Sequence, residues 1–107
     1  MKGQVVAEVS VVPVGTGDAG LSHYVAACLE ILEGREDLSY QLTPMGTVIE
    51  GSLEKVLDVA RQMHEVPFDR GASRVVTSLK IDERRDKPST MASKVESVLK
   101  LRPSIKA

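Results

Sequence analysis

The sequence predicts an α+β fold of the ferredoxin-like class, a βαββαβ two-layer sandwich with an antiparallel sheet and an additional C-terminal helix. Three observations predict it. Apolar residues follow an extended pattern in four short segments, they recur at helical spacing in three others, and these segments succeed one another as β-α-β-β-α-β-α. The length suits one core rather than two, so we expect residues 1–107 to form a single domain.

The first strand is predicted over residues 5–12, where polar and apolar side chains alternate and β-branched residues dominate. After a loop, residues 21–32 place apolar side chains at a spacing of 3.6 residues, which is typical of an amphipathic helix. We expect Ser22 to cap this helix, Cys28 to lie on its buried side and Gly34 to mark its end.

A β-hairpin is predicted next, with strands over residues 40–43 and 47–50. The intervening residues 44–46 are Pro-Met-Gly, in which proline fixes φ and glycine supplies a positive φ for the turn. Ser52 then caps a second helix, whose apolar stripe is Leu53, Val56, Leu57, Ala60 and Met63, and we expect Pro67 to end it.

The last strand is predicted over residues 74–81, again with alternating side chains. Residues 82–87 alternate in charge, which favours a solvated loop, with ion pairs between subunits as the second interpretation. A third helix is expected from about residue 89 to residue 101, stopped by Pro103.

Two helices cover only one face of such a sheet, so the other face is expected to be free. We expect the first and last strands to be neighbours at the centre of the sheet and to send polar side chains to the free face. That face would carry these polar residues and valines: Glu8, Ser10, Gln41, Thr43, Glu50, Arg74, Ser78 and Lys80, with Val6, Val12, Val48 and Val76. Two interpretations stay open, a solvated or oligomer-forming surface and a ligand pocket partly covered by a second subunit.

Composition argues against several classes of partner. A formal net charge of −1 disfavours nucleic acid and anionic membranes, and no apolar run is long enough to cross a bilayer. A lone Cys28 forms no intramolecular disulfide and leaves no cysteine cluster for zinc, so we expect no metal, no cofactor and a cytoplasmic location.

Chemical motifs are sparse, and we expect the chain not to be an enzyme. Residues 15–20 satisfy G-x-G-x-x-G between a strand and a helix, but too few strands follow for a dinucleotide-binding sheet, so a tight glycine turn is favoured. His23 and His64 fall on different helices, with His64 near a helix end, and neither forms an evident pair with Cys28.

The residues required by three familiar functions of this topology are also absent. Central-strand aromatics for RNA, the asparagine of acylphosphatase-like hydrolysis and the clustered cysteines of a ferredoxin are all missing from the sequence.

Three blocks of sequence resemble the thiamine-binding protein family: E-V-S-V-V-P-V-G-T-G from Glu8, Y-Q-L-T-P-M-G-T-V-I-E-G from Tyr40, and G-A-S-R-V-V-T-S-L-K-I-D-E-R-R-D-K from Gly71. The resemblance covers about residues 5–98. It implies a ferredoxin-like fold, sheets that associate into homodimers and usually homotetramers, and binding of thiamine or its hydroxymethylpyrimidine moiety without turnover. Thus the expected partners are a small molecule and further copies of the chain.

Residues whose chemistry suits such a ligand lie in or near these blocks. Hydroxyls and carboxylates match the donors and acceptors of an aminopyrimidine, a carboxylate favours the thiazolium cation, and Met45 offers a polarizable contact to a flat ring. The predicted binding residues are Glu8, Ser10, Thr43, Met45, Thr47, Glu50 and Ser78. Strict alternation would send Thr43 and Thr47 to opposite faces. The alternatives are an ACT-like regulatory or scaffolding module and an enzyme acting on a thiamine precursor.

Overall fold

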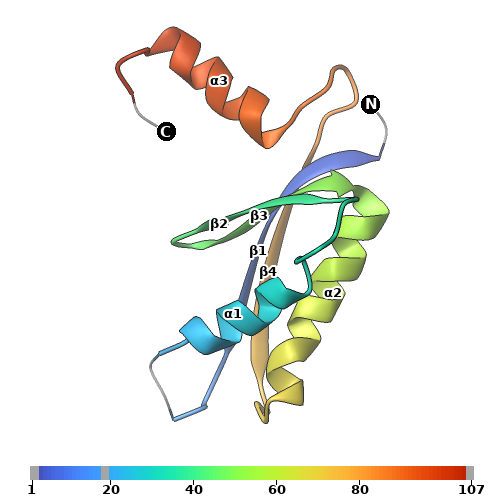
Figure 1. Cartoon of the computed structure of the whole chain (residues 1–107), viewed down its shortest axis with the longest axis vertical. Coiled ribbons are helices and arrows are strands. Elements are labelled where there is room, and N and C mark those ends of the chain that lie inside the picture. The colour runs from blue at the N-terminus through green and yellow to red at the C-terminus, as the bar shows by residue number, and fades with distance from the viewer. Residues whose placement is uncertain (1–2, 18–19, 106–107) are drawn as a thin grey trace.

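The computed structural model of the chain describes residues 3–17 and 20–105. The elements are β1 (Gln4–Pro13), α1 (Ser22–Glu30), β2 (Ser39–Thr43), β3 (Gly46–Ser52), α2 (Leu53–Asp69), β4 (Val75–Glu83) and α3 (Met91–Leu101). The four strands form one antiparallel sheet in the order β2-β3-β1-β4. The predicted ferredoxin-like fold with an added C-terminal helix is confirmed (Figure 1).

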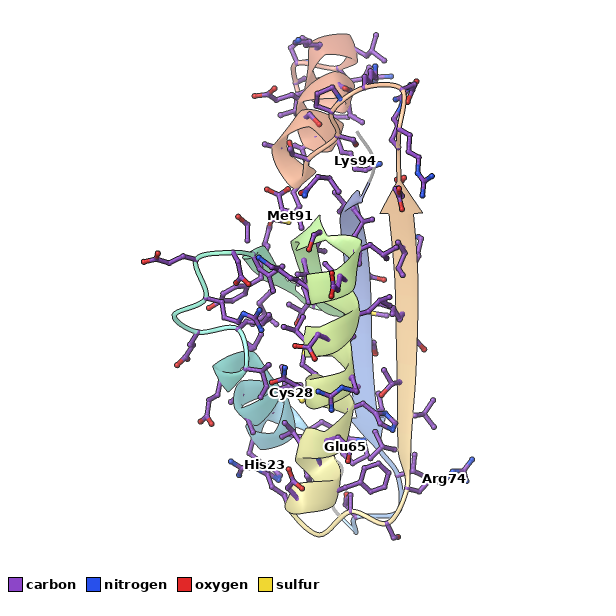
Figure 2. The ribbon with its side chains drawn as sticks, turned by 90° about the vertical axis from the view of Figure 1, so that its right-hand side faces the viewer. His23, Cys28, Glu65, Arg74, Met91 and Lys94 are labelled. Carbon is purple, nitrogen blue, oxygen red and sulfur yellow. The ribbon has the colours of Figure 1, made fainter. Side chains whose placement is uncertain are left out.

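Both α1 and α2 lie on the same side of the sheet (Figure 2). The side chains beneath them alternate along the strands as predicted, because Val5, Ala7 and Val9 of β1 stand opposite Gly51, Ile49 and Thr47 of β3. The core residues are nearly all aliphatic: Val5, Ala7, Val9, Cys28, Leu32, Leu38, Ile49, Val56, Val59, Ala60 and Met63. The predicted parity of the hairpin is also confirmed, since Tyr40 and Leu42 pair with Ile49 and Thr47 on the helix side.

The position of β4 differs from the prediction. This strand pairs with β1 as predicted, but it lies at the edge of the sheet and not at its centre. The two central strands are β1 and β3, because β1 has a neighbour on each side. As a result Leu79 and Ile81, which point to the helix side, remain 37% and 40% exposed.

Helix α1 begins and ends differently from the sequence-based expectation. Ser22 is its first residue and not its cap; Leu21 is the N-cap and provides no side-chain hydrogen bond. The helix ends at Glu30, and Leu32 lies in the following turn although it is only 1% exposed. Apolar spacing therefore identified the buried side of this segment better than it identified the helix boundaries.

Helix α2 begins as predicted, because the Ser52 hydroxyl accepts a hydrogen bond from the amide of Lys55. Pro67 does not end it; the helix continues to Asp69. A proline at this position has no N–H for the carbonyl of Met63 four residues earlier. The Cys28 thiol of α1 donates to that carbonyl instead, with an S···O distance of 3.5 Å, and so replaces the missing bond.

Two further predictions about α2 are wrong. Leu57 is 44% exposed, whereas Val59, which was not part of the predicted stripe, is fully buried. His64 lies inside the helix and not at its end, and its Nδ1 is 2.7 Å from the Thr77 hydroxyl of β4. This side chain therefore helps to join α2 to the edge strand.

The hairpin turn consists of Pro44 and Met45, and Gly46 already belongs to β3. The φ of Gly46 is not positive, contrary to the prediction. Glycine is required there for a different reason: a Cβ atom at Gly46 would lie 2.9 Å from the carbonyl oxygen of Val9. The absent side chain lets the hairpin tip approach β1 closely.

Helix α3 lies beyond one end of the sheet (Figure 1). Thr90 caps it in a capping box with Ser93, and the Glu50 carboxylate accepts a hydrogen bond of 2.7 Å from the Met91 amide. An ion pair between Lys94 and Asp82 adds a second attachment to the sheet. The apolar side chains of α3 find little cover in the described chain: Val95, Val98 and Leu101 are 43%, 52% and 81% exposed.

Candidate functional site

A hollow of about 460 Å³ lies at the tip of the β2–β3 hairpin, between that tip, the second half of β1 and helix α1. Figure 1 shows α1 beside the free end of the hairpin. The lining residues come from all three segments and from α2: Val9, Ser10, Val11, Val12, Leu21, Ser22, Val25, Ala26, Cys28, Leu29, Leu42, Thr43, Pro44, Met45, Gly46, Thr47 and Met63. We call this the tip hollow. Its volume is within the range of about 300–1,000 Å³ that is usual for small-molecule sites.

The wall of the tip hollow is apolar and uncharged. None of its described lining residues is an aspartate, glutamate, lysine, arginine or histidine. Its side-chain hydroxyls come from Ser10, Ser22, Thr43 and Thr47. An apolar hollow with a few polar groups suits a small neutral molecule that has a flat ring and a small number of hydrogen-bonding groups.

Thr47 is the most informative of these hydroxyl residues. It is only 3% exposed, because β3 turns its side chain to the helix side between Val9 and Leu42. Among the hydrogen bonds of the described residues, its hydroxyl takes part in none. Among the described residues, no fully buried side-chain nitrogen or oxygen lacks a partner, so the Thr47 hydroxyl is open to solvent in the tip hollow, where a ligand would take the place of water.

The hydroxyl of Thr43 has a different role. It donates to the carbonyl of Gly46 at 2.9 Å and accepts from the amide of Met45 at 3.3 Å. These bonds hold the two-residue turn and place Met45, which is 81% exposed, at the mouth of the tip hollow. Thr43 therefore shapes the site, whereas Thr47 offers it an unused polar group.

Cys28 and Met63 join α1 to α2 where both helices border the tip hollow. Figure 2 shows Cys28 between these two helices. Burial raises the pKa of the Cys28 thiol, and the nearby Arg70 charge only partly opposes this effect. The thiol thus stays protonated and serves as a hydrogen-bond donor rather than as a nucleophile.

A second hollow, of about 350 Å³, lies at the opposite end of the sheet beside the start of α3, and we call it the α3 hollow. Three of its four described charged lining residues are bound elsewhere in the chain, Asp37 to Arg35, Arg84 to Asp86 and Glu50 to the Met91 amide, and the fourth is Glu36. Arg35 donates to Asp37 at 2.7 Å, and this guanidinium holds the pKa of Asp37 far below its usual range. Arg84 likewise lowers the pKa of Asp86 to about 2.

The seven predicted binding residues fall into three places. Ser10, Thr43, Met45 and Thr47 line the tip hollow, and Thr43 and Thr47 both do so although strict alternation sends their side chains to opposite faces. Glu8 and Ser78 lie on the open face, where Glu8 stands between Val48 and Lys80 and Ser78 stands opposite Ser10. Glu50 lies in the α3 hollow, and its carboxylate is bound to the first amide of α3.

Glu8 lies next to the tip hollow although its side chain is on the open face. A Cβ atom built on Gly46, which lines the hollow, would be 3.5 Å from the Glu8 Cγ. Glu50 is farther away. It pairs with Val6, four residues along β1 from Ser10, or about 13 Å at the usual rise of a strand.

Sequence reasoning missed the contribution of α1 to this site. Leu21, Val25 and Leu29 belong to the apolar spacing that predicts an amphipathic helix over residues 21–32, but they are only half-buried and line the tip hollow. Ser22 was predicted to be a helix cap and instead contributes a hydroxyl to the rim. The expected position of the hairpin tip was the one signal that could have indicated this role of α1. Apolar spacing alone shows which side of a helix is apolar, but not whether that side is packed in the core or borders a hollow.

Comparison with known proteins assigns the family. Residues 7–99 match the family described as thiamine-binding protein. The chain belongs to this family. Among its relatives, the UPF0045 protein YqgV of Bacillus subtilis is 47% identical over 98 residues, which cover 89% of this chain and 94% of that protein.

Solved structures of similar proteins share the fold. That of the hypothetical protein MJ1052 from Methanocaldococcus jannaschii aligns with a TM-score of 0.81 at 40% identity, over 89% of this chain and 95% of that one. A Thermotoga maritima protein assigned provisionally to thiamine biosynthesis or salvage aligns with a TM-score of 0.73 at 24% identity, over 89% and 98% of the two chains. The second likeness bears on the fold alone.

None of the helices within residues 3–17 and 20–105 is long and apolar enough to cross a membrane. In the same part of the chain, no group of three or more histidine, cysteine, aspartate or glutamate side chains is arranged to hold a metal ion.

Proposed function

We propose that the tip hollow binds the aminopyrimidine ring of hydroxymethylpyrimidine or of thiamine, and that the chain serves as a carrier, buffer or sensor of this ligand. The observation that carries the proposal is Thr47, whose hydroxyl forms no hydrogen bond with the described residues and opens into an apolar hollow of suitable size, where a ligand would replace solvent. Membership in the thiamine-binding protein family supports the choice of ligand.

The missing charge on the wall favours the neutral part of the ligand. A permanent cation buried there would have no counter-charge among the described lining residues, and burying an unpaired charge is costly. We therefore place the aminopyrimidine inside the hollow, and the thiazolium of thiamine at its mouth, near Met45 and the Glu8 carboxylate beside Gly46. In this arrangement Glu8, rather than Glu50, attracts the cation.

Binding without turnover also fits the composition of the wall. General acid–base catalysis needs a titratable group within hydrogen-bonding reach of the reacting atom. The described lining residues include no carboxylate, histidine or lysine, and Cys28 is held in its protonated form. This favours a binding protein over an enzyme acting on a thiamine precursor.

We further propose that the chain forms homodimers that assemble into homotetramers. Edge strand β4 leaves Leu79 and Ile81 exposed on the helix side, and α3 leaves Val95, Val98 and Leu101 exposed. A second copy that continues the sheet at β4 would pair the unused strand edge and cover these side chains. Light scattering should give a mass of at least two chains, and a monodisperse monomer would contradict this part of the proposal.

Calorimetry tests the ligand directly. We expect hydroxymethylpyrimidine and thiamine both to bind, and Thr47→Val, which keeps the shape but removes the hydroxyl, to weaken both by about tenfold. Thr77→Val is the matched control, since this strand threonine already contacts His64 and lies outside the tip hollow. Absence of heat and of a thermal shift at millimolar ligand would refute the proposed function.

Glu8→Gln separates the two parts of thiamine. It should weaken thiamine binding and leave hydroxymethylpyrimidine binding unchanged, because only thiamine carries the cation. Equal loss for both ligands would remove the proposed role of Glu8.

An ACT-like regulatory or scaffolding module is the second candidate, favoured by the exposed apolar residues of β4 and α3. A stable oligomer that binds neither ligand would support it and exclude the binding function.

A further inference from the structure

We propose that the peptide groups of Val11 recognise the aminopyrimidine edge of the ligand, with the Val11 N–H donating to a ring nitrogen and the Val11 carbonyl accepting from the adjacent amino group. This inference rests on the proposed function and goes one step further, because it assigns ligand selectivity to the backbone edge of one strand. It requires that both polar groups of Val11 point into the tip hollow and have no strand partner there.

The direction of these groups follows from the register of β1. The Val14 amide, just after β1, donates to the carbonyl of Arg74, just before β4, at 2.8 Å. Val14 and Arg74 are therefore a hydrogen-bonded pair of the β1–β4 ladder. Hydrogen-bonded pairs alternate in an antiparallel ladder. Even-numbered residues of β1 therefore bond to β4, whereas Val9, Val11 and Pro13 turn their backbone polar groups to the opposite edge.

Two other contacts agree with this alternation. The Gly3 carbonyl accepts from the Leu53 amide at the start of α2, on the β3 side of β1. At the other end, the Val9 carbonyl is the atom that a Cβ on Gly46 would meet at 2.9 Å, so it also points toward β3. Odd-numbered residues at both ends of β1 thus use the same edge.

The β1–β3 ladder ends before Val11. Its last pair is Val9 with Thr47, while β1 continues to Pro13 in register with β4. The next rung would join Val11 to Met45, but the chain has turned there, and the Met45 amide bonds to the Thr43 hydroxyl instead. Val11 therefore faces the tip hollow, which it lines, with no partner in β3.

Pro13 cannot provide the backbone donor that the proposal requires. It lies on the same edge as Val11 but has no N–H, so it offers an acceptor only. Val9 is already paired with Thr47. Within the described part of β1 that passes the hollow, Val11 alone offers both a donor and an acceptor to this edge.

The chemistry of the ligand matches this pair. In an extended residue the N–H and the C=O lie side by side and point the same way, as they do when a strand binds an added peptide. A 4-aminopyrimidine presents a ring-nitrogen acceptor next to an amino donor, which is the complementary order. A pyrimidinone in the same ring orientation presents a carbonyl and a ring N–H in reverse order, which would place donor against donor and acceptor against acceptor, so it could pair with Val11 only with its ring turned over and its substituents displaced.

Calorimetry on a proline variant is the first test. Val11→Pro removes the donor and leaves the β4 ladder intact, because the Val11 amide points away from β4 and the strand already holds a proline two residues later. We expect hydroxymethylpyrimidine to bind about five- to tenfold more weakly. The pyridine analogue, with C–H in place of the ring nitrogen beside the amino group, should bind both proteins equally.

The amide signal of Val11 provides a second test that needs no substitution. In ¹⁵N-valine-labelled protein, hydroxymethylpyrimidine should shift the Val11 amide proton downfield, and the pyridine analogue should not. If both ligands bind wild type but neither the proline variant nor the Val11 signal distinguishes them, the Val11 assignment is wrong and the proposed function stands. If neither ligand binds wild type, the proposed function itself fails.

Discussion

The tip hollow and the α3 hollow lie at opposite ends of one sheet and differ in what their polar groups already do. At the α3 hollow, Glu50 is bound to the Met91 amide and Asp37 to Arg35. At the tip hollow, the hydroxyl of Thr47 has no hydrogen-bond partner among the described residues and opens to solvent, and the polar edge of Val11 has no partner in β3. Most of the charges at the α3 hollow are thus satisfied by the protein itself, whereas the less charged tip hollow keeps polar groups that are open to a ligand.

This difference shows why counting polar residues misleads. Glu50 was predicted to bind the ligand because a carboxylate suits a cation, but the position of α3 gives that carboxylate another use. A group contributes to binding when the fold leaves it without a partner, and this depends on distant segments. A ligand gains more from polar groups that only solvent contacts than from charges that the protein already pairs.

The two glycines of β3 give the largest expected effects, and they separate the two ends. Gly46→Ala places a methyl group 2.9 Å from the Val9 carbonyl at the tip, and Gly51→Ala places one 2.3 Å from Leu38 Cδ2 near the α3 hollow. Each should cost about 1–3 kcal/mol of stability in urea unfolding. Only Gly46→Ala should also weaken pyrimidine binding, and equal loss in both variants would contradict the assignment of the site.

The contact between Cys28 and Met63 beside the tip hollow should contribute less. Cys28→Ala leaves the Met63 carbonyl without its donor, and we expect a loss of about 1–2 kcal/mol in urea unfolding. Pro67→Ala restores an N–H four residues after Met63, so the same cysteine substitution should cost less in that background. An identical cost in both backgrounds would show that the thiol does not replace the missing helical bond.

Glu50→Gln tests the α3 hollow and should have a smaller effect. It removes a negative charge at the N-terminus of α3, where such a charge stabilises a helix by about 0.3–1 kcal/mol. We expect a slight decrease in helical circular dichroism and stability, with thiamine affinity unchanged. A thiamine-selective loss of affinity would instead restore Glu50 to the binding site.

The acid dependence of stability should give the smallest effect. The pKa of Asp86 is lowered to about 2 by Arg84, and that of Asp37 is lowered by Arg35. Because the folded pKa lies below the unfolded one, this stabilisation is complete above the ordinary carboxyl pKa of about 4 and disappears as the pH falls toward 2. Thermal unfolding should show a small extra loss of stability between about pH 4 and pH 2, and Asp86→Asn should reduce this loss. A pH profile of stability that Asp86→Asn leaves unchanged would contradict the prediction.

The fold was largely predictable because alternation along the strands and apolar spacing along the helices both act locally. The parity of the hairpin, the Ser52 cap and the burial of Cys28 were predicted correctly for this reason. The errors concern contacts between segments. Pro67 stays within α2 because a thiol from α1 bonds to the freed carbonyl, and Gly46 is needed because the tip approaches β1.

The same reason explains which parts of the candidate site were predictable. Four of the seven predicted residues line the tip hollow; Thr43, Met45 and Thr47 do so because the residues around the hairpin turn are adjacent in sequence, and Ser10 joins them from β1. Side-chain types cannot reveal the backbone edge of Val11, because its availability depends on where the β1–β3 ladder ends.

Mapping of amide chemical shifts with hydroxymethylpyrimidine tests the central claim most directly, because one titration observes both ends of the sheet. The account predicts that the shifts concentrate in residues 9–12, 21–29 and 42–47, and that residues 36–39 and 84–90 at the α3 hollow stay unchanged. Shifts confined to the α3 hollow or to the open face of β4 would contradict it.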